Sequence, residues 1–204
     1  MSDEKNTYSA VSGSRQPHGK RAEIVSIDAP NRLFVEGKEL FSLKNYSGCI
    51  DKLEAYKQHS TDADLIQEAD YMLVYSAYEQ GRLNAVELLK DYLDVYPASR
   101  HADEVNFLIG SAHFGLGEYQ KAIFWFNESN IDMLSPEQQE AYCFRLAYSL
   151  LQTGDMEKAR GYFARIEQIG TKYREASTYY VAYIDYATVN TTMPWWNLPL
   201  EGLV

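Results

Sequence analysis

Cysteine and basic residues are both scarce in this chain of 204 residues. The only two cysteines, Cys49 and Cys143, lie far apart, without a CxxC spacing or the pattern of a disulfide scaffold, so we expect them to be small packing residues. Lysine and arginine number 19 against 29 aspartates and glutamates, which gives a formal net charge of −10. Because nucleic acids are bound largely through basic side chains that neutralise phosphates, this balance argues against a nucleic-acid partner.

Long apolar runs and catalytic motifs are also missing. No stretch approaches the roughly 18 apolar residues of a transmembrane helix, and the opening Met-Ser-Asp-Glu-Lys lacks the apolar run of a signal peptide. The chain has no GxGxxG, Walker or GxSxG motif. His101 and Glu104 form an HxxE pair, but no third ligand follows at a suitable spacing. We therefore expect no membrane insertion, no catalytic residue, no cofactor and no metal.

What the chain does contain is a dense apolar pattern with a period of 3.6 residues, which is typical of amphipathic helices. Residues 1–29 begin with a polar, serine-rich stretch and are expected to form a flexible arm. Residues 30–189 are expected to fold, and residues 190–204 to form an irregular tail. The pattern predicts nine helices, at roughly residues 30–43, 46–59, 63–80, 83–96, 100–116, 118–130, 136–153, 155–168 and 171–188.

An internal repeat organises these helices into pairs. Gly110-Ser-Ala-His-Phe-Gly-Leu-Gly-Glu-Tyr-Gln-Lys-Ala122 and Ala147-Tyr-Ser-Leu-Leu-Gln-Thr-Gly-Asp-Met-Glu-Lys-Ala159 share a small residue, a turn glycine seven positions later, and a small residue five positions after that. A glycine at the turn permits the left-handed conformation that ends a helix. Phe126 and Phe163 are expected to fill the space between hairpins. The turn residues are Lys44, Gly81, Gly117 and Gly154, with spacings of 37, 36 and 37.

Helix boundaries carry signals of their own. Ser135-Pro-Glu-Gln138 offers a capping hydroxyl, a proline at the first helical position and a glutamine to complete a capping box. Antiparallel helix pairs that repeat along the chain predict an all-α fold, an α-solenoid with a right-handed superhelix made of about four hairpins plus a ninth helix.

The combination of a small residue, an aromatic residue, a turn glycine, tyrosine and alanine resembles the tetratricopeptide repeat (TPR). The resemblance is strongest in Phe107-Leu-Ile-Gly-Ser-Ala-His-Phe-Gly-Leu-Gly-Glu-Tyr-Gln-Lys-Ala-Ile123 and covers about three quarters of the chain. The first hairpin departs from the family at Lys44, and the second has a shorter turn. The repeat length resembles that of bacterial cell-envelope members, such as the lipoprotein of the outer-membrane barrel-assembly machine, the Tol–Pal-associated coordinator and the N-terminal repeats of large Bacteroidetes proteins. The resemblance favours the periplasm or cell envelope, whereas the missing signal peptide leaves the cytoplasm open.

The family geometry implies that residues ten, six and three positions before each turn line a concave groove. The residue ten before the turn is aromatic in every copy, if Val189 counts as a fifth turn. Aromatic rings could grip a peptide, or they could simply pack between neighbouring helices. The predicted partner-binding residues are Tyr71, Tyr75, Tyr78, Phe107, Phe114, Phe144, Tyr148, Tyr179, Tyr183 and Tyr186; the first hairpin contributes Phe34, Lys38 and Phe41 at the same positions.

The resulting prediction is a non-catalytic scaffold that binds a protein or peptide in an aromatic groove. The alternative is a structural spacer, or a fragment of a longer array that self-associates through its last helix. The tail, Met-Pro-Trp-Trp-Asn-Leu-Pro, does not continue the repeat. It is either a cap in which Trp195 and Trp196 cover the final hydrophobic face, or the product of a frame change after Asn190.

Overall fold

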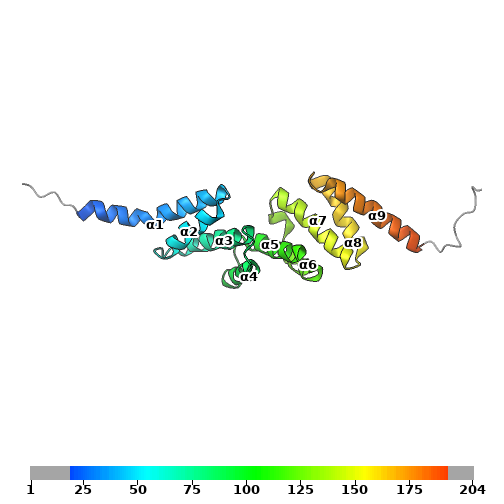
Figure 1. Ribbon diagram of the computed structural model, residues 1–204, viewed down its shortest axis with the longest axis horizontal. Helices are drawn as coiled ribbons and strands as arrows, with labels where there is room; N and C mark the ends of the chain where they lie inside the picture. Colours follow the sequence, from blue (N-terminus) through cyan, green and yellow to red (C-terminus); the bar gives the residue numbers. More distant parts are fainter. Residues whose placement is uncertain (1–18, 193–204) are drawn as a thin grey trace, which may run out of the picture. The chain divides into compact units, whose positions relative to one another are not determined.

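The computed structural model describes the backbone of residues 19–192 and the side chains of residues 30–189 (Figure 1). Within this part of the chain every regular element is a helix, which confirms the predicted all-α repeat fold. None of the described helices is long and apolar enough to cross a membrane. The helices divide into two compact units, residues 1–62 and residues 63–204, and each is described by itself.

In the first unit, α1 (Gly19–Ser42) and α2 (Tyr46–Lys57) pack as a hairpin. Lys44 takes the left-handed conformation at the turn, with a φ of 58°, in the place where the other hairpins have glycine. The two helices approach closely at Gly37, where an added Cβ would lie 2.6 Å from Leu53 Cδ2. α1 begins at Gly19, within the segment predicted as an arm, and runs through Pro30. Proline removes one helical hydrogen bond and can kink a helix without ending it. Pro30 accordingly lies inside α1.

The second unit contains three hairpins and a final helix. They are α3 (Ala63–Glu79) with α4 (Ala85–Val95), α5 (Ala102–Gly115) with α6 (Tyr119–Asn127), α7 (Pro136–Gln152) with α8 (Met156–Ile169), and α9 (Arg174–Thr192); a short 3-10 turn, Ile131–Met133, precedes α7. The turn glycines Gly81, Gly117 and Gly154 have φ values of 65°, 72° and 92°, as the repeat predicted. The capping box of Ser135 and Gln138 is also confirmed.

The core of the second unit lies between the two helices of each hairpin and between successive hairpins. Ala122, Phe126, Ala159 and Phe163 are completely buried, as predicted. Cys143 is buried as well, and burial raises the pKa of its thiol to about 11, which suits an unreactive packing residue. Cys49 is equally buried in the first unit. Both cysteines are free thiols.

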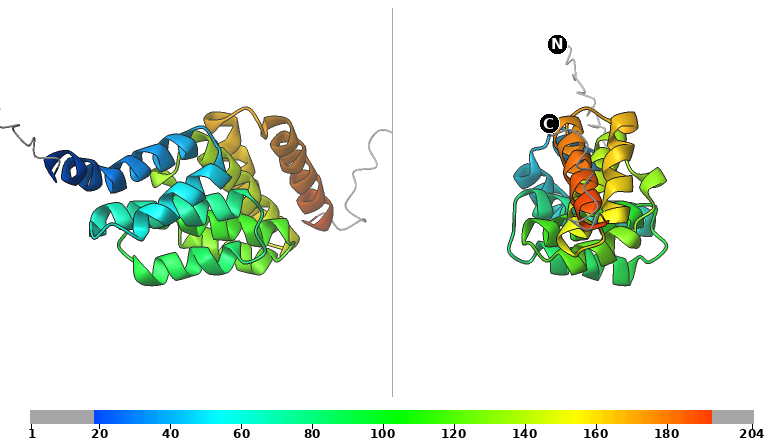
Figure 2. Two further views of the ribbon diagram at one scale, coloured as in Figure 1. Left: turned by 60° about the vertical axis from the view of Figure 1, so that its left-hand side comes forward. Right: turned by 90° about the vertical axis from the view of Figure 1, so that its right-hand side faces the viewer.

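The final helix, α9, packs against α8 and is anchored to α7 at its start (Figure 2). The backbone N–H of Tyr173 donates to a carboxylate oxygen of the buried Glu140, with an N to O distance of 2.7 Å. α9 continues to Thr192, three residues into the segment predicted as an irregular tail. The remainder of that segment, with Trp195 and Trp196, lies outside the described residues, so its predicted role as a cap stays a prediction.

Candidate partner-binding surface

The ring ten residues before each turn packs against a ring of its own second helix. This arrangement recurs in all four hairpins. The pairs and their ring-centroid distances are Phe34–Tyr56 at 5.2 Å, Tyr71–Tyr92 at 6.3 Å, Phe107–Phe126 at 6.1 Å and Phe144–Phe163 at 5.8 Å. Tyr71 and Phe107, two of the predicted groove residues, are buried in these contacts. Phe144 remains partly exposed.

The ring three residues before the turn also points to the second helix. Phe114 lies 6.2 Å from Tyr119, at the start of α6, and the rings meet edge to face at 65°. In the first unit Phe41 and Tyr46 repeat this geometry at 6.2 Å and 70°. Phe114 and Phe41 therefore contact the second helix of their own hairpins, whereas Tyr78, at the same position on α3, hydrogen-bonds Ser111 and Arg145 of the following first helices.

The position six residues before the turn is the one that leaves tyrosines accessible. Tyr75 on α3 and Tyr148 on α7 are half-buried, and Tyr183 on α9 is 47% exposed. On α5 the same position is Ser111, which is buried. Because α3, α5, α7 and α9 are the first helices of successive hairpins, these positions form one surface, which we call the first-helix face.

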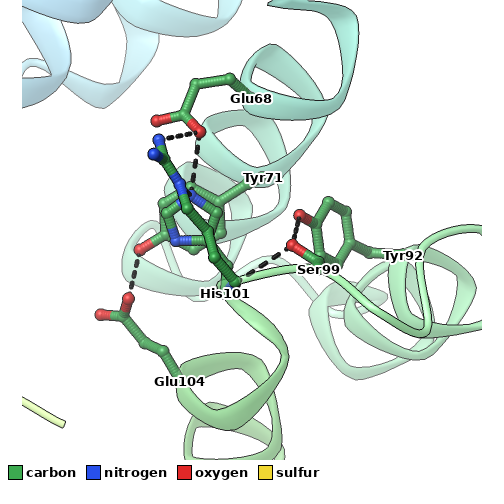
Figure 3. A network of polar contacts seen from close by, with 7 residues as sticks. Glu68, Tyr71, Tyr92, Ser99, His101 and Glu104 are labelled. Carbon is green, nitrogen blue, oxygen red and sulfur yellow. Dashed lines mark hydrogen bonds and ion pairs between the residues drawn. The ribbon is translucent and has the colours of Figure 1, made fainter. Parts of the chain in front are cut away.

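A polar network joins α3 to α5 on this face (Figure 3). The ring of Tyr71 stacks on His101 at a centroid distance of 3.6 Å, and its hydroxyl donates to Glu104 at 2.6 Å. Glu68 lies 2.6 Å from Arg100 Nη2 and 2.9 Å from His101 Nε2. Burial opposes ionisation of Glu68, but hydrogen bonds from His101 and Arg100 outweigh it and lower its pKa. Burial and the neighbouring Glu104 raise the pKa of Tyr71, so its hydroxyl remains a donor.

The network continues from α5 to α7. The second oxygen of Glu104 accepts a hydrogen bond from Gln138 Nε2 at 2.5 Å. Arg145 Nη1 donates to the hydroxyl of Ser111 at 2.5 Å, and its guanidinium lies 5.6 Å from the centroid of the Phe107 ring. Successive first helices are thus tied to one another by side chains, and the first-helix face is a continuous, ordered surface.

Tyr148 is the centre of an aromatic cluster that spans α5, α6, α7 and α9. Ring centroids lie around it at 5.6 Å (Tyr180), 5.8 Å (Phe114 and Tyr119) and 6.4 Å (Phe144). Pairs of this kind prefer tilted or edge-to-face geometry at 4.5–7 Å. Tyr148 therefore packs as well as lining the surface, so a change at this residue affects both stability and binding.

On α9 the predicted rings are the most exposed of the set. Tyr179 is 65% exposed and Tyr186 is 72% exposed. These two residues stand ten and three positions before Val189, where the earlier hairpins place rings that face the second helix. Their exposure arises because the described residues include no second helix for α9.

The histidines and carboxylates of residues 30–189 form no metal-binding cluster. No group of three or more histidine, cysteine, aspartate or glutamate side chains is placed to hold a metal ion in this range. His101 and Glu104, the HxxE pair, turn to different partners, Glu68 and Tyr71. His113 is buried and hydrogen-bonds Glu118 through Nδ1 at 2.6 Å, while its Nε2 has no hydrogen-bond partner.

The contacts between hairpins could not be read from motifs, but they do carry a sequence signal. The pairs Glu68–His101 and Tyr71–Glu104 are 33 residues apart, and Glu104–Gln138 and Ser111–Arg145 are 34 apart. A search for complementary polar residues slightly less than one repeat apart would have found them.

Comparisons with known proteins agree with this architecture. Residues 27–115 match a family described as outer membrane lipoprotein (YfiO). Residues 103–129 and 140–169 match two tetratricopeptide repeat families. These two matches fall on α5–α6 and on α7–α8, so each contains one hairpin of the structure. No curated protein matches the chain.

Proposed function

Because the chain is a tetratricopeptide-repeat protein that resembles cell-envelope members of that family, we propose that it is a non-catalytic scaffold that binds a protein or peptide along the first-helix face of its second unit. The observation that carries the proposal is the accessibility of tyrosine at one repeat position, Tyr75, Tyr148 and Tyr183. Tyrosine is enriched at binding hot spots, because it offers a large apolar ring and a hydroxyl at a low entropic cost.

The surroundings of these tyrosines support a preformed site. Hydrogen bonds link α3 to α5 and α5 to α7, and the aromatic cluster around Tyr148 reaches α9. A surface that is already ordered loses little conformational entropy when a partner binds. A protein or peptide is the partner that fits, because accessible rings on α3, α7 and α9 can contact a chain at several points.

The experiment is an affinity capture with the full chain as bait, followed by a binding titration with the captured partner. The variants are Tyr75→Ala and Tyr183→Ala, with Tyr148→Phe in place of alanine because truncation would open the aromatic cluster. Each lost anchor is expected to cost about 1–2 kcal/mol, so the combined Tyr75→Ala, Tyr183→Ala variant should bind at least tenfold more weakly. Unchanged affinity with unchanged helicity would refute the proposal.

The matched control places alanine at two exposed positions on second helices, Glu87→Ala and Gln120→Ala. These substitutions should leave affinity within twofold of the parent. If they weakened binding as much as the tyrosine variants do, the partner would bind the second-helix side instead.

We also propose a second candidate function, self-association of the array through α9. Its support is the exposure of Tyr179, Tyr186 and Val189 on a helix whose main contacts, within the described part of the chain, are with α8. Exposed apolar patches often mark interaction surfaces.

A further inference from the structure

The interface inside the α5–α6 hairpin has an antiparallel design. On α5, a ring, a small residue and a ring stand ten, seven and three positions before the turn; these are Phe107, Gly110 and Phe114. On α6, a ring, a small residue and a ring have the same spacing; these are Tyr119, Ala122 and Phe126. The outer rings pair crosswise, and the small residues lie between them.

Distances in this hairpin support the description. Phe107 pairs with Phe126 at 6.1 Å, and Phe114 pairs with Tyr119 at 6.2 Å. At the middle, a Cβ on Gly110 would lie 2.7 Å from Phe126 Cδ1, so the backbone of α5 approaches α6 closely. The facing sides of α5 and α6 therefore carry the same i, i+3, i+7 pattern, and the two helices run antiparallel.

The exposed face of α9 carries this pattern unpaired. Tyr179, Ala182 and Tyr186 have the spacing i, i+3, i+7, and all three are exposed. They stand at the repeat positions of Phe107, Gly110 and Phe114, which face α6 in the α5–α6 hairpin. Since α5 and α6 share the pattern, this face of α9 has the features of both sides of that interface.

Charge does not oppose contact between two copies of this face. From Ala176 to Val189 the only charged residue is Asp185, and it forms an ion pair with Arg160 of α8. In a chain with a net charge of −10, a helical face free of charge over four turns is a place where two copies can meet without like charges opposite each other.

We propose that two copies of this chain associate through α9, each supplying the second helix that completes the other's fifth hairpin. The interface is isologous, as a two-fold axis requires, and the helices run antiparallel as they do in every hairpin. Tyr179 of one copy packs against Tyr186 of the partner copy, and Ala182 meets its own counterpart at the axis. The inference rests on the second function proposed above and specifies which residues meet.

Cross-linking tests the geometry directly. Ala182→Cys places the two new thiols at the axis, where they should join in a disulfide under mild oxidation. The native cysteines cannot interfere, because Cys49 and Cys143 are completely buried. The control, Gln120→Cys, exposes a thiol away from α9 and should remain monomeric on a non-reducing gel.

Mass measurement tests the interface without a cross-link. In sedimentation velocity over a rising concentration series, the parent should move from the mass of one chain towards twice that mass. Ala182→Glu should abolish the shift by placing two carboxylates together at the axis, whereas Gln120→Glu adds the same charge on α6 and should dimerise like the parent. Higher salt should strengthen the parent dimer by screening the net charge of the two chains.

Two results would overturn the inference. A parent that stays monomeric at all concentrations, with no disulfide in Ala182→Cys, would show that the occupant of this face is another protein or another part of the chain. A dimer that survives Ala182→Glu would place the interface elsewhere. Tyr75 keeps the two proposals distinguishable, because it lies on α3 and not on α9, and the affinity of the Tyr75→Ala variant is measured separately with the captured partner.

Discussion

The close approach of α5 and α6 at Gly110 gives the sharpest prediction about the hairpin interface. A Cβ at this position would lie 2.7 Å from Cδ1 and 2.8 Å from Cε1 of Phe126, which is completely buried. Ordinary contacts between carbon atoms are about 3.5–4.0 Å, so the ring or the helix must move by about 1 Å in Gly110→Ala. Overpacking of this kind costs roughly 1–3 kcal/mol.

Alanine also favours a helix over glycine by about 1 kcal/mol, which obscures the packing cost in a single variant. Gly161 in α8 removes this difficulty, since it is exposed in a helix interior and a Cβ there meets nothing within 4 Å. Gly161→Ala should therefore raise the free energy of unfolding by about 0.5–1 kcal/mol. The difference between the two variants isolates the packing cost, and we expect Gly110→Ala to be less stable than Gly161→Ala by about 1–3 kcal/mol.

Urea unfolding followed by circular dichroism at 25 °C measures both free energies on the same protein. In thermal melts the same difference should separate the two midpoints by roughly 2–12 °C, at about 2–4 °C per kcal/mol for a chain of this length. Phe126→Leu supplies a further check, because the smaller side chain relieves the contact and Gly110→Ala should then cost nothing more. Equal stability of Gly110→Ala and Gly161→Ala would refute the close approach.

The remaining predictions concern the anchoring of α9 and the network around Glu68. Gly170 has extended backbone, but a Cβ there would overlap the carboxylate of Glu140. Gly170→Ala should therefore displace that carboxylate from Tyr173 and speed hydrogen exchange of the backbone amides at the start of α9. Unchanged exchange would contradict the anchoring role of Glu140. Hydrogen bonds from His101 and Arg100 hold the pKa of Glu68 below 4.5 despite burial, so the stability that its ionised form contributes is present above pH 4.5 and lost as the pH falls below it. The gap in unfolding free energy between the parent and Glu68→Gln should accordingly close as the pH is lowered through 4.5, and a gap that stays constant in urea titrations would refute the role of the ionised form.

The parts of the fold that depend on local chemistry could be predicted from the sequence. A serine followed by proline and glutamine caps a helix through contacts within one turn, and α7 begins where Ser135 predicts. A glycine after an amphipathic stretch ends a helix for a backbone reason, and Gly81, Gly117 and Gly154 all take positive φ. Lys44 takes the same left-handed conformation although it is not glycine, because the packed α1–α2 hairpin holds the turn.

The choice among the aromatic positions could not be made from periodicity. Residues ten, six and three before the turn all lie on one broad side of the first helix, and the sequence does not say which part of that side the second helix covers. The structure places Tyr71 and Phe107 against the second helix and leaves Tyr75 and Tyr183 accessible. The start of α1 could not be predicted for a different reason, because the polar, serine-rich composition of residues 1–29 is typical of an arm, whereas α1 begins at Gly19.

The exposure of the rings on α9 therefore depends on which helices pack against them and not on the residue types. Tyr179 has the same repeat position as the buried Phe107, and Ala182 has the position of Gly110. A ring that is buried in one hairpin is a surface ring on α9, because no facing helix lies among the described residues. The apolar transfer free energy that stabilises a hairpin, about 25 cal/mol for each Å² removed from water, is then still available to an incoming helix. A helix that carries the same i, i+3, i+7 pattern of rings and a small residue, as a second copy of α9 does, has the features needed to cover this face.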